Sequence, residues 1–255
     1  MAYQALEAAS FGPSARYHLD RLLGLGATSE VWKAIPAHMQ GPVAIKVLRA
    51  QSPAGALGPV LIEHERQALR RVRHPGVVRL LHGARHQGWP YLVLQHLEGE
   101  TLTARLARGP LAPAAVVALA RQLAATLQAV HRAGVLHLDV HPRNVMMTGE
   151  NGSSRAVLFD FGDACARPDP TERLYAVWTR PGERAPELLR GLPVDPRTDL
   201  WGLGTLLLSA AGGTTERLTP ALRALIPRLC AADPAERPVS AAMVADLLGT
   251  SGEPR

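Results

Sequence analysis

The pattern of hydrophobic and polar residues changes character about 100 residues into the chain. Before that point the apolar runs are short and glycine interrupts them, which predicts strands. Three such runs lie between Tyr17 and Lys46: YHLDRLLGLG, SEVWKAIP and GPVAIKVL. The run HPGVVRLLHGARHQGWPYLVLQHL, which starts at His74, reads as two or three more strands. This part of the chain is therefore predicted to be rich in β-structure.

One helix is expected inside this β-rich region. A loop comes first, marked by Pro53, Gly55, Gly58 and Pro59. The segment LIEHERQALRRVR follows, and its apolar residues recur at helical spacing: Leu61, Ile62, Ala68, Leu69 and Val72.

After Gly99 the apolar spacing becomes helical. APAAVVALARQLAATLQAVHRAG predicts a long helix that stops at Gly134, a residue typical of helix C-termini. Short strands are expected within residues 135–161, a Pro-rich loop over 163–186, and helices in the remainder. The fold class is therefore α+β, in two lobes. The expected limits are a tail at 1–16, a β-rich lobe at about 17–96, a mostly helical lobe at about 99–248, and a tail at 249–255.

Composition narrows the function classes. Of the 255 residues 47% are hydrophobic and 20% charged, as in ordinary globular proteins. The net charge of +6 comes from arginine, because Lys33 and Lys46 are the only lysines. The arginines are scattered, which favours a solvated surface, so no nucleic-acid partner is expected.

Three further observations favour a cytoplasmic protein without a membrane partner. Cys165 and Cys230 form no CxxC or metal-ligand pattern, which suits a reducing compartment. The first sixteen residues lack the basic start and apolar run of a signal peptide. The run LWGLGTLLLSAAGG is shorter than the ~18–20 apolar residues of a membrane span and reads as a buried helix.

Two motifs in the β-rich region suit phosphate binding. GLGATSEV places Gly24 and Gly26 between strand-like runs, where backbone amides can approach an anion closely. An ordinary turn would read the same way, and Ser29 replaces the third glycine of G-x-G-x-x-G. In VAIK, Lys46 lies in an apolar strand and needs an anionic partner, unless it is an edge-strand lysine that reaches water.

Two motifs after the long helix carry oxygen ligands. LDVHPRN supplies Asp139 and Asn144, and VLFDFGD places Asp160 at the end of an apolar strand. Carboxylate and amide oxygens suit magnesium and a hydroxyl nucleophile. Each residue taken alone could equally be a turn former or a helix cap.

In this order the motifs resemble the signature set of the protein-kinase family. The set comprises GLGATSEV, VAIK, HLDVHPRN, DFG (160–162), APE (185–187) and DLWGLG (199–204), with HPGVV (74–78) and ADPAERP (232–238) as further landmarks. The resemblance spans about residues 17–248 and implies a two-lobed, protein-kinase-like fold that uses ATP and Mg²⁺.

The resemblance also implies roles for single residues. Lys46 would hold the α- and β-phosphates and pair with Glu65, with Glu63 as a less favoured partner. Asp139 would accept or orient the substrate hydroxyl proton, and Asn144 and Asp160 would bind magnesium. The remaining ATP-binding positions would be Gly24, Gly26, Val31, Ala44, Leu94 as gatekeeper, the backbone of Gln95, His96 and Leu97, and Met146. Two structural contacts are expected as well: Glu187 with Arg237, and Asp199 with the catalytic-loop amides.

The chain departs from the family pattern inside the catalytic loop. The family reads HRDxKxxN, whereas Leu138 replaces the arginine and His141 the lysine. Without that arginine a phosphate on residues 163–184 lacks its usual anchor. Activity is therefore expected to be independent of phosphorylation there, although Thr171, Tyr175 and Thr179 are available. His141 takes the catalytic lysine's place as a weaker cation near pH 7.

Three functional readings follow. The favoured one is an ATP- and magnesium-dependent serine/threonine protein kinase with a protein substrate and a possible regulatory partner. The second is a pseudokinase that serves as a nucleotide-binding scaffold. The third is a small-molecule phosphotransferase, because D-x-H-P-x-N also resembles the loop of aminoglycoside and choline phosphotransferases. About twenty residues separate Ala211 from Asp233, so a helix that commonly docks substrates is expected to be shortened or absent.

Overall fold

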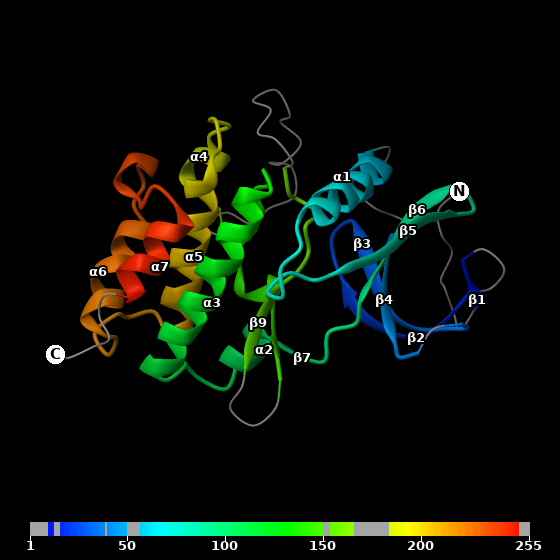
Figure 1. The fold of residues 1–255 in the computed structure, drawn as a ribbon, viewed down its shortest axis with the longest axis horizontal. Coiled ribbons are helices and arrows are strands. Elements are labelled where there is room, and N and C mark those ends of the chain that lie inside the picture. Colours follow the sequence, from blue (N-terminus) through cyan, green and yellow to red (C-terminus); the bar gives the residue numbers. More distant parts are fainter. Residues whose placement is uncertain are drawn as a thin grey trace. The chain divides into compact units, whose positions relative to one another are not determined.

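The structure is a computed structural model that describes residues 10–12, 16–38, 40–49, 57–149, 154–165 and 184–249. The chain divides into two compact units (Figure 1). The first unit comprises Met1–Arg70 and Val78–Leu97, and the second comprises Arg71–Val77 and Glu98–Arg255.

The first unit is built on one antiparallel sheet, so the predicted β-rich region is confirmed. Its strands are β1 (Ser10–Phe11), β2 (Tyr17–Leu25), β3 (Ser29–Pro36), β4 (Val43–Leu48), β5 (Leu80–His86) and β6 (Trp89–Gln95). They lie in the order β1-β2-β3-β4-β6-β5. The predicted strands after His74 form the β5–β6 hairpin, whose turn places Gln87 and Gly88 at positive φ.

The two faces of this sheet differ in chemistry. Successive side chains of a strand point to opposite faces, so β4 sends Ile45 one way and Ala44 and Lys46 the other. Ile45 belongs to a closed hydrophobic cluster, which is formed by Phe11, Tyr17, Leu19, Ala34, Val43, Ile45, Val47, Tyr91 and Val93. The opposite face is therefore the one that can present Lys46 to a ligand.

Strand β1 lies within residues 1–16, for which the sequence predicts a tail. Ser10 pairs with His18 and Phe11 with Tyr17. The side chain of Phe11 is fully buried, and its ring packs edge-on against Tyr91 at a centroid distance of 4.9 Å. The structure differs from the predicted tail. A single buried aromatic residue produces no repeating spacing of apolar residues, so the sequence pattern does not reveal this strand.

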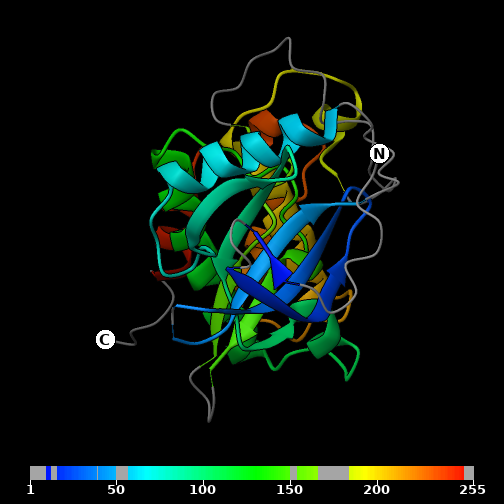
Figure 2. The same ribbon diagram turned by 90° about the vertical axis from the view of Figure 1, so that its right-hand side faces the viewer.

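Helix α1 (Gly58–Arg71) lies alongside this sheet (Figure 2), and it confirms the predicted helix. It begins earlier than the sequence indicates, since Gly58 and Pro59 belong to its first turn instead of a loop. Proline is tolerated there because the first N–H groups of a helix have no intrahelical partner. Its buried residues include Ile62, Ala68 and Leu69, which carry the predicted apolar spacing.

The second unit is mainly helical, as predicted. Its helices are α2 (Leu102–Leu106), α3 (Pro113–Arg132), α4 (Pro186–Leu189), α5 (Pro196–Ala210), α6 (Pro220–Leu229) and α7 (Ala241–Gly249). A small sheet has the order β7-β8-β9, from β7 (Gly99–Thr101), β8 (Val145–Thr148) and β9 (Arg155–Leu158). Helix α3 contacts α5, α7 and β9, and α5 contacts α6, which gives the unit its core (Figure 1).

Among the described residues, α3 is the helix long and apolar enough to cross a membrane by length and composition. The sequence pattern did not indicate such a candidate. One side of α3 is buried in the unit, through Val116, Leu119, Ala120, Leu123, Ala124, Thr126, Leu127 and Val130. A core helix of a soluble protein passes the same test, so α3 is weak evidence for a membrane span. Its end follows the prediction, with Gly134 at φ +69 just beyond the C-cap Ala133.

The connection after α5 is short. Residues 211–219 run through turns, and α6 then leads directly to the ADPAERP segment. The described segment from Ala211 to Asp233 therefore holds one helix, as the shortened spacing predicts.

Candidate active site

The glycine-rich hairpin of β2 and β3 is closed by backbone contacts. Gly24 pairs with Val31, and the Gly26 amide donates to the Ser29 carbonyl at 2.8 Å. A Cβ on Gly26 would lie 3.3 Å from that carbonyl oxygen, whereas a Cβ on Gly24 would meet nothing within 4 Å. Arg49, the residue after β4, holds the loop, because its Nη1 donates to the Gly26 carbonyl at 3.1 Å.

Lys46 forms the predicted ion pair with Glu65. Its Nζ lies 2.6 Å from Glu65 Oε2, and the two side chains are 6% and 1% exposed. Burial of this kind requires opposite charges in contact. Glu63 points elsewhere and takes Arg66 as its partner on the more exposed side of α1, at 2.6 and 2.8 Å.

Four of the predicted ATP-binding residues share one face of the first sheet. Lys46 lies opposite Val31 across β3 and β4, and Ala44 lies opposite Leu94 across β4 and β6. Directly opposed residues project to the same face, and so do residues two apart on one strand. The next residue, Gln95, is exposed, and its backbone N–H donates to the Arg79 carbonyl at 2.8 Å.

The loop that carries Asp139 is anchored by Asp199 of α5. One carboxylate oxygen accepts the Leu138 N–H at 2.7 Å, and the other accepts the His137 N–H at 2.9 Å and contacts His131 Nε2 at 2.8 Å. Burial by itself would raise the pKa of Asp199, but these hydrogen bonds and the two histidines outweigh it and hold the pKa below its usual value. The predicted contact of Asp199 with the catalytic-loop amides is present.

His137 connects this loop to the DFG segment. Its Nδ1 accepts the Asp139 N–H at 3.2 Å, and its Nε2 lies 3.2 Å from the Phe159 carbonyl oxygen. These two contacts orient the imidazole ring. It packs edge-on against Phe161 at a centroid distance of 4.6 Å. The sequence pattern assigns no role to His137, although it stands in the quoted motif.

Asp139 and Asn144 are in direct contact within the loop. Asn144 Nδ2 donates to Asp139 Oδ2 at 2.7 Å and to the Asp139 carbonyl at 2.9 Å. Both amide hydrogens are thereby used, which directs the amide oxygen of Asn144 toward other ligands. His141 begins the short 3-10 helix Pro142–Asn144, and its Nδ1 accepts the Arg143 N–H at 3.3 Å.

Two residues of these loops have strained backbones. Leu138 has φ +62 and Asp160 has φ +61, a region that non-glycine residues rarely adopt. The Gly162 N–H contacts Asp160 Oδ1 at 3.3 Å, and Asp199 holds the Leu138 amide. Strained backbone conformations persist only where surrounding contacts enforce them. The fold therefore holds both loops in place despite the backbone strain at Leu138 and Asp160.

The oxygen donors fit a magnesium ion only in combination with a ligand. Mg²⁺ takes oxygen ligands in octahedral geometry and is commonly held by one or two carboxylates plus phosphates. Asp160 and Asn144 are donors of this type. Within the described ranges no group of three or more His, Cys, Asp or Glu residues could hold a metal ion. The donor set therefore suits a metal that phosphate oxygens help to bind.

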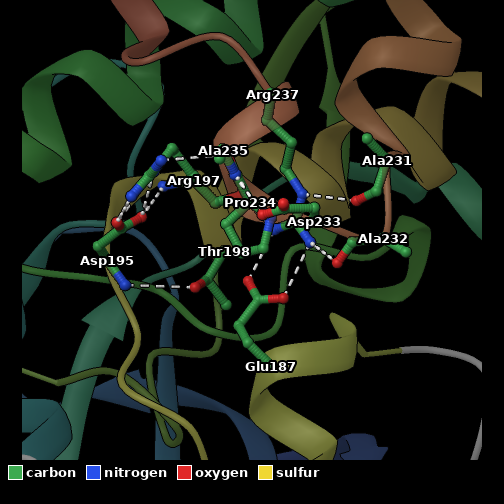
Figure 3. Close-up of polar contacts among 10 residues, drawn as sticks. All are labelled: Glu187, Asp195, Arg197, Thr198, Ala231, Ala232, Asp233, Pro234, Ala235 and Arg237. Carbon is green, nitrogen blue, oxygen red and sulfur yellow. Dashed lines mark hydrogen bonds and ion pairs between the residues drawn. The ribbon is translucent and has the colours of Figure 1, made fainter.

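A second ion pair, Glu187 with Arg237, lies in a dense polar network (Figure 3). The Arg237 guanidinium donates to both carboxylate oxygens at 2.7 and 2.9 Å, and to the carbonyls of Ala231, Ala232 and Arg197. Burial by itself would raise the pKa of Glu187, but the hydrogen bonds and charge of Arg237 outweigh it and lower the pKa. The predicted pair is present.

A third charge pair has no counterpart in the predicted set. Arg184 Nη2 contacts Asp163 Oδ2, and only 3% of Arg184 is exposed. The two residues are 21 positions apart without a local signal that would link them. The predicted phosphorylation positions Thr171, Tyr175 and Thr179 lie outside the described residues.

Comparison with known proteins identifies the family. The protein kinase domain model matches residues 17–216. The chain is 36% identical over 235 residues to the serine/threonine-protein kinase PknD of Mycobacterium tuberculosis, covering 89% of this chain and 34% of PknD. It is 31% identical over 268 residues to the serine/threonine-protein kinase pkn2 of Myxococcus xanthus, covering 92% and 32% of the two chains. The chain belongs to the protein kinase family, and these relatives are of the serine/threonine type.

Solved structures give the same fold. A mutant of the Mycobacterium tuberculosis PknI kinase domain matches with a TM-score of 0.74 and 26% identity, covering 98% of this chain and 100% of that domain. The α+β, two-lobed kinase fold expected from the sequence is confirmed. The chain spans about a third of the length of the curated relatives it matches.

Proposed function

We propose that the chain is an ATP- and magnesium-dependent serine/threonine protein kinase, which transfers the γ-phosphoryl group of ATP to a hydroxyl of a protein. The main support for this proposal is the set of contacts that holds the loop around Asp139. Asp139 contacts both His137 and Asn144, in a loop whose backbone Asp199 anchors. A domain end near residue 248 belongs to the same proposal, and strand β1 adds Ser10 and Phe11 to the first sheet.

In the proposed reaction the substrate hydroxyl oxygen attacks the γ-phosphorus. The bond between that phosphorus and the β,γ-bridging oxygen breaks, and ADP leaves. Asp139 orients the hydroxyl and accepts its proton. Most of the acceleration in such transfers comes from positioning and charge stabilisation, because the transition state is loose. The rigid support of Asp139 is the property that this chemistry requires.

Most of the residues proposed to bind the nucleotide belong to the strands, loops and helix α1 of the first unit, and Met146 belongs to β8. Lys46, oriented by Glu65, would contact the α- and β-phosphates, and the Gly24 and Gly26 backbone would cover them. Because the Gln95 N–H is already engaged by Arg79, the Gln95 carbonyl is the group available for the adenine edge. Val31, Ala44 and Met146 would sandwich the ring, with Leu94 as gatekeeper and the backbone of His96 and Leu97 beside the adenine edge.

Asn144 and Asp160 are the residues that would hold magnesium together with the phosphates. The ion would supply neutralisation of the charge on the transferred group. Asp139 contributes by fixing the orientation of the Asn144 amide through the 2.7 Å hydrogen bond.

His141 is proposed to replace the usual lysine near the γ-phosphate. With Nδ1 accepting from the Arg143 backbone, a neutral imidazole carries its proton on Nε2. It would therefore act through one N–H donor on the other side of the ring, with less charge than an ammonium.

The proposal extends to partners and location. The substrate is a protein, a regulatory partner is expected, and no nucleic-acid partner is proposed. A cytoplasmic location is proposed from the two cysteines, which form no CxxC or metal-ligand pattern.

Transfer of labelled phosphate from ATP and Mg²⁺ to the chain itself and to a generic basic protein tests the proposal. The native chain is compared with Asp139→Asn and with Asp246→Asn, a matched change at an exposed position of α7. We expect transfer by the native chain and by Asp246→Asn, and none by Asp139→Asn.

Other outcomes identify the alternatives. Transfer by Asp139→Asn at the native rate would remove the catalytic role of Asp139. Thermal stabilisation by ATP without any transfer would instead favour a nucleotide-binding scaffold. A screen of hydroxylated metabolites and aminoglycosides then separates the scaffold from a small-molecule phosphotransferase.

A further inference from the structure

Two segments of the second unit, residues 163–165 and residues 184–188, are joined by a buried charge contact. The Arg184 guanidinium contacts the Asp163 carboxylate, and its side chain is 2% exposed against 31% for Asp163. An arginine buried to this extent would be costly without an anionic partner. The contact therefore specifies how these two segments meet.

The same segments meet the catalytic loop in a hydrophobic cluster, which we call the apolar clamp: Leu136, Leu138, Cys165 and Leu188. All four residues are buried. The backbones of Leu136 and Cys165 also exchange two hydrogen bonds, each 2.9 Å long. The clamp thus ties the loop before Asp139 to residues that follow the DFG segment and to α4.

The clamp explains how the chain accommodates Leu138. This residue has φ +62, yet its side chain is buried beside Cys165 and Leu188, and Asp199 accepts its N–H. An arginine here would place a guanidinium among apolar side chains. The position therefore contributes packing to the loop, and a different residue has to provide the positive charge.

Arg184 lies where that charge is needed. Partial burial raises the pKa of Asp163, the charge of Arg184 opposes this, and the carboxylates of Asp139 and Asp160 add to it. One guanidinium both offsets the mutual repulsion of these carboxylates and holds Asp163 in place.

We propose that Arg184 is a positioning residue of the active site: through Asp163 and the apolar clamp it keeps the Asp139 loop and the DFG segment in register without a phosphorylated side chain. This inference rests on the proposed kinase function and names the device that replaces the missing arginine of the catalytic loop. A positioning residue acts through others, so its loss changes the rate of transfer more than nucleotide binding.

The test compares Arg184→Met, Asp163→Asn and the double variant, with Arg184→Lys as the conservative change. Arg190→Met, an exposed arginine at the end of α4, is the matched control. All proteins are treated with phosphatase, and intact mass confirms that they carry no phosphate. The measurements are kcat, KM for ATP, KM for the generic basic protein used as substrate, and amide hydrogen exchange of the peptide that covers residues 136–139.

We expect the dephosphorylated native chain and Arg190→Met to be active. In Arg184→Met, kcat should fall by about ten- to a hundredfold, because small displacements of reacting groups cost about that much. KM for ATP should stay within about twofold, while exchange at 136–139 accelerates. The double variant should be no slower than the slower single variant, since coupled residues are not additive, and Arg184→Lys should recover part of kcat.

Three results would overturn the inference. They are an unchanged kcat in Arg184→Met, a native chain that is active only when phosphorylated, and a higher KM for the protein substrate in Arg184→Met but not in Asp163→Asn. If the native chain transfers no phosphate at all, the kinase proposal fails separately. Hydrogen exchange then still decides whether Arg184 orders the loop: faster exchange in Arg184→Met supports this, and unchanged exchange refutes it.

Discussion

Each of the two units contains a buried glutamate paired with a cation, and the two pairs differ in how the cation is bound. In the first unit, the Lys46 ammonium meets one oxygen of Glu65 at 2.6 Å. In the second, the Arg237 fork meets both oxygens of Glu187 and three backbone carbonyls. The guanidinium of the second pair thus branches to several partners, whereas the first pair joins strand β4 to helix α1.

The difference follows from the chemistry of the two cations. A guanidinium has five donors in a rigid plane, and it suits a site where every donor finds a protein partner. An ammonium is compact and rotates freely, so it can serve a carboxylate and a phosphate at once. The comparison teaches that Arg237 is built into the fold, and that Lys46 is the cation suited to a ligand.

The largest effect is expected from breaking the network. Arg237→Met should lower the free energy of unfolding by about 3–5 kcal/mol, because Glu187 would remain buried without its partner. Urea unfolding measures this. Arg108→Met is the control, since the Arg108–Glu100 pair has side chains 59% and 36% exposed and its loss should not change the midpoint measurably. Equal midpoints for the native chain and Arg237→Met would contradict the structural role.

Breaking the Lys46–Glu65 pair should mainly lower the rate of phosphoryl transfer. Lys46→Met should lower kcat by about 10²–10³-fold, the usual cost of removing one group that stabilises transition-state charge. Lys33→Met is the matched control, because Lys33 is the one other lysine. Its Nζ lies 3.5 Å from Asp20 Oδ2, near the surface.

Measurements of the free energy of unfolding distinguish two roles of Lys46: its ion pair with Glu65 and its effect on phosphoryl transfer. The single variant leaves Glu65 buried without the ammonium of Lys46, which destabilises the fold. In the double variant Lys46→Met with Glu65→Gln no charge remains, so unfolding free energy should recover while transfer stays low. Recovery of transfer in the double variant would show that Lys46 acts only through the fold.

A smaller effect on the free energy of unfolding is expected when the pH is lowered. Because the pKa of Glu187 is lowered from 4.5 in the folded chain, its ionised form stabilises the protein above about pH 4.5. That stability is lost as the pH falls below this value through the folded pKa. Urea unfolding from about pH 6 to about pH 3 measures the decline. Arg237→Met should decline less steeply, and an identical slope would exclude Glu187 as its source.

The smallest effect is expected beside the network, at the start of α5. Asp195 caps this helix by accepting the Arg197 N–H at 2.8 Å. Asp195→Ala should cost about 1 kcal/mol of unfolding free energy, and Asp195→Asn should retain most of it, because asparagine caps equally well. If the two variants are equally destabilised, the charge contact with Arg197 matters more than the cap.

Much of the fold could be predicted because its elements repeat at short range. The strands around Gly24 and Lys46 are short apolar runs interrupted by glycine, and α3 repeats its apolar residues at helical spacing. The start of α1 and the pairing of β1 could not be predicted in this way. Pro59 reads as a loop signal although a first turn accepts it, and Phe11 is a single residue without a repeat.

The candidate site, too, was predictable in part from the sequence and in part only from the structure. The motif order supplies Lys46, Asp139, Asn144 and Asp160, and the structure brings Asp139 and Asn144 into contact. The preference for Glu65 over Glu63 is also confirmed by the ion pair with Lys46.

By itself, the sequence determined the succession of strands and helices and the residue types that phosphoryl transfer needs, because both depend on local spacing and motif order. Only the tertiary structure decided that Arg184 contacts Asp163, that Leu138 packs in the apolar clamp, and that His137 links the Asp139 loop to Phe159. These contacts join residues far apart in the chain, and their energies depend on burial and on partners that only the folded backbone brings together.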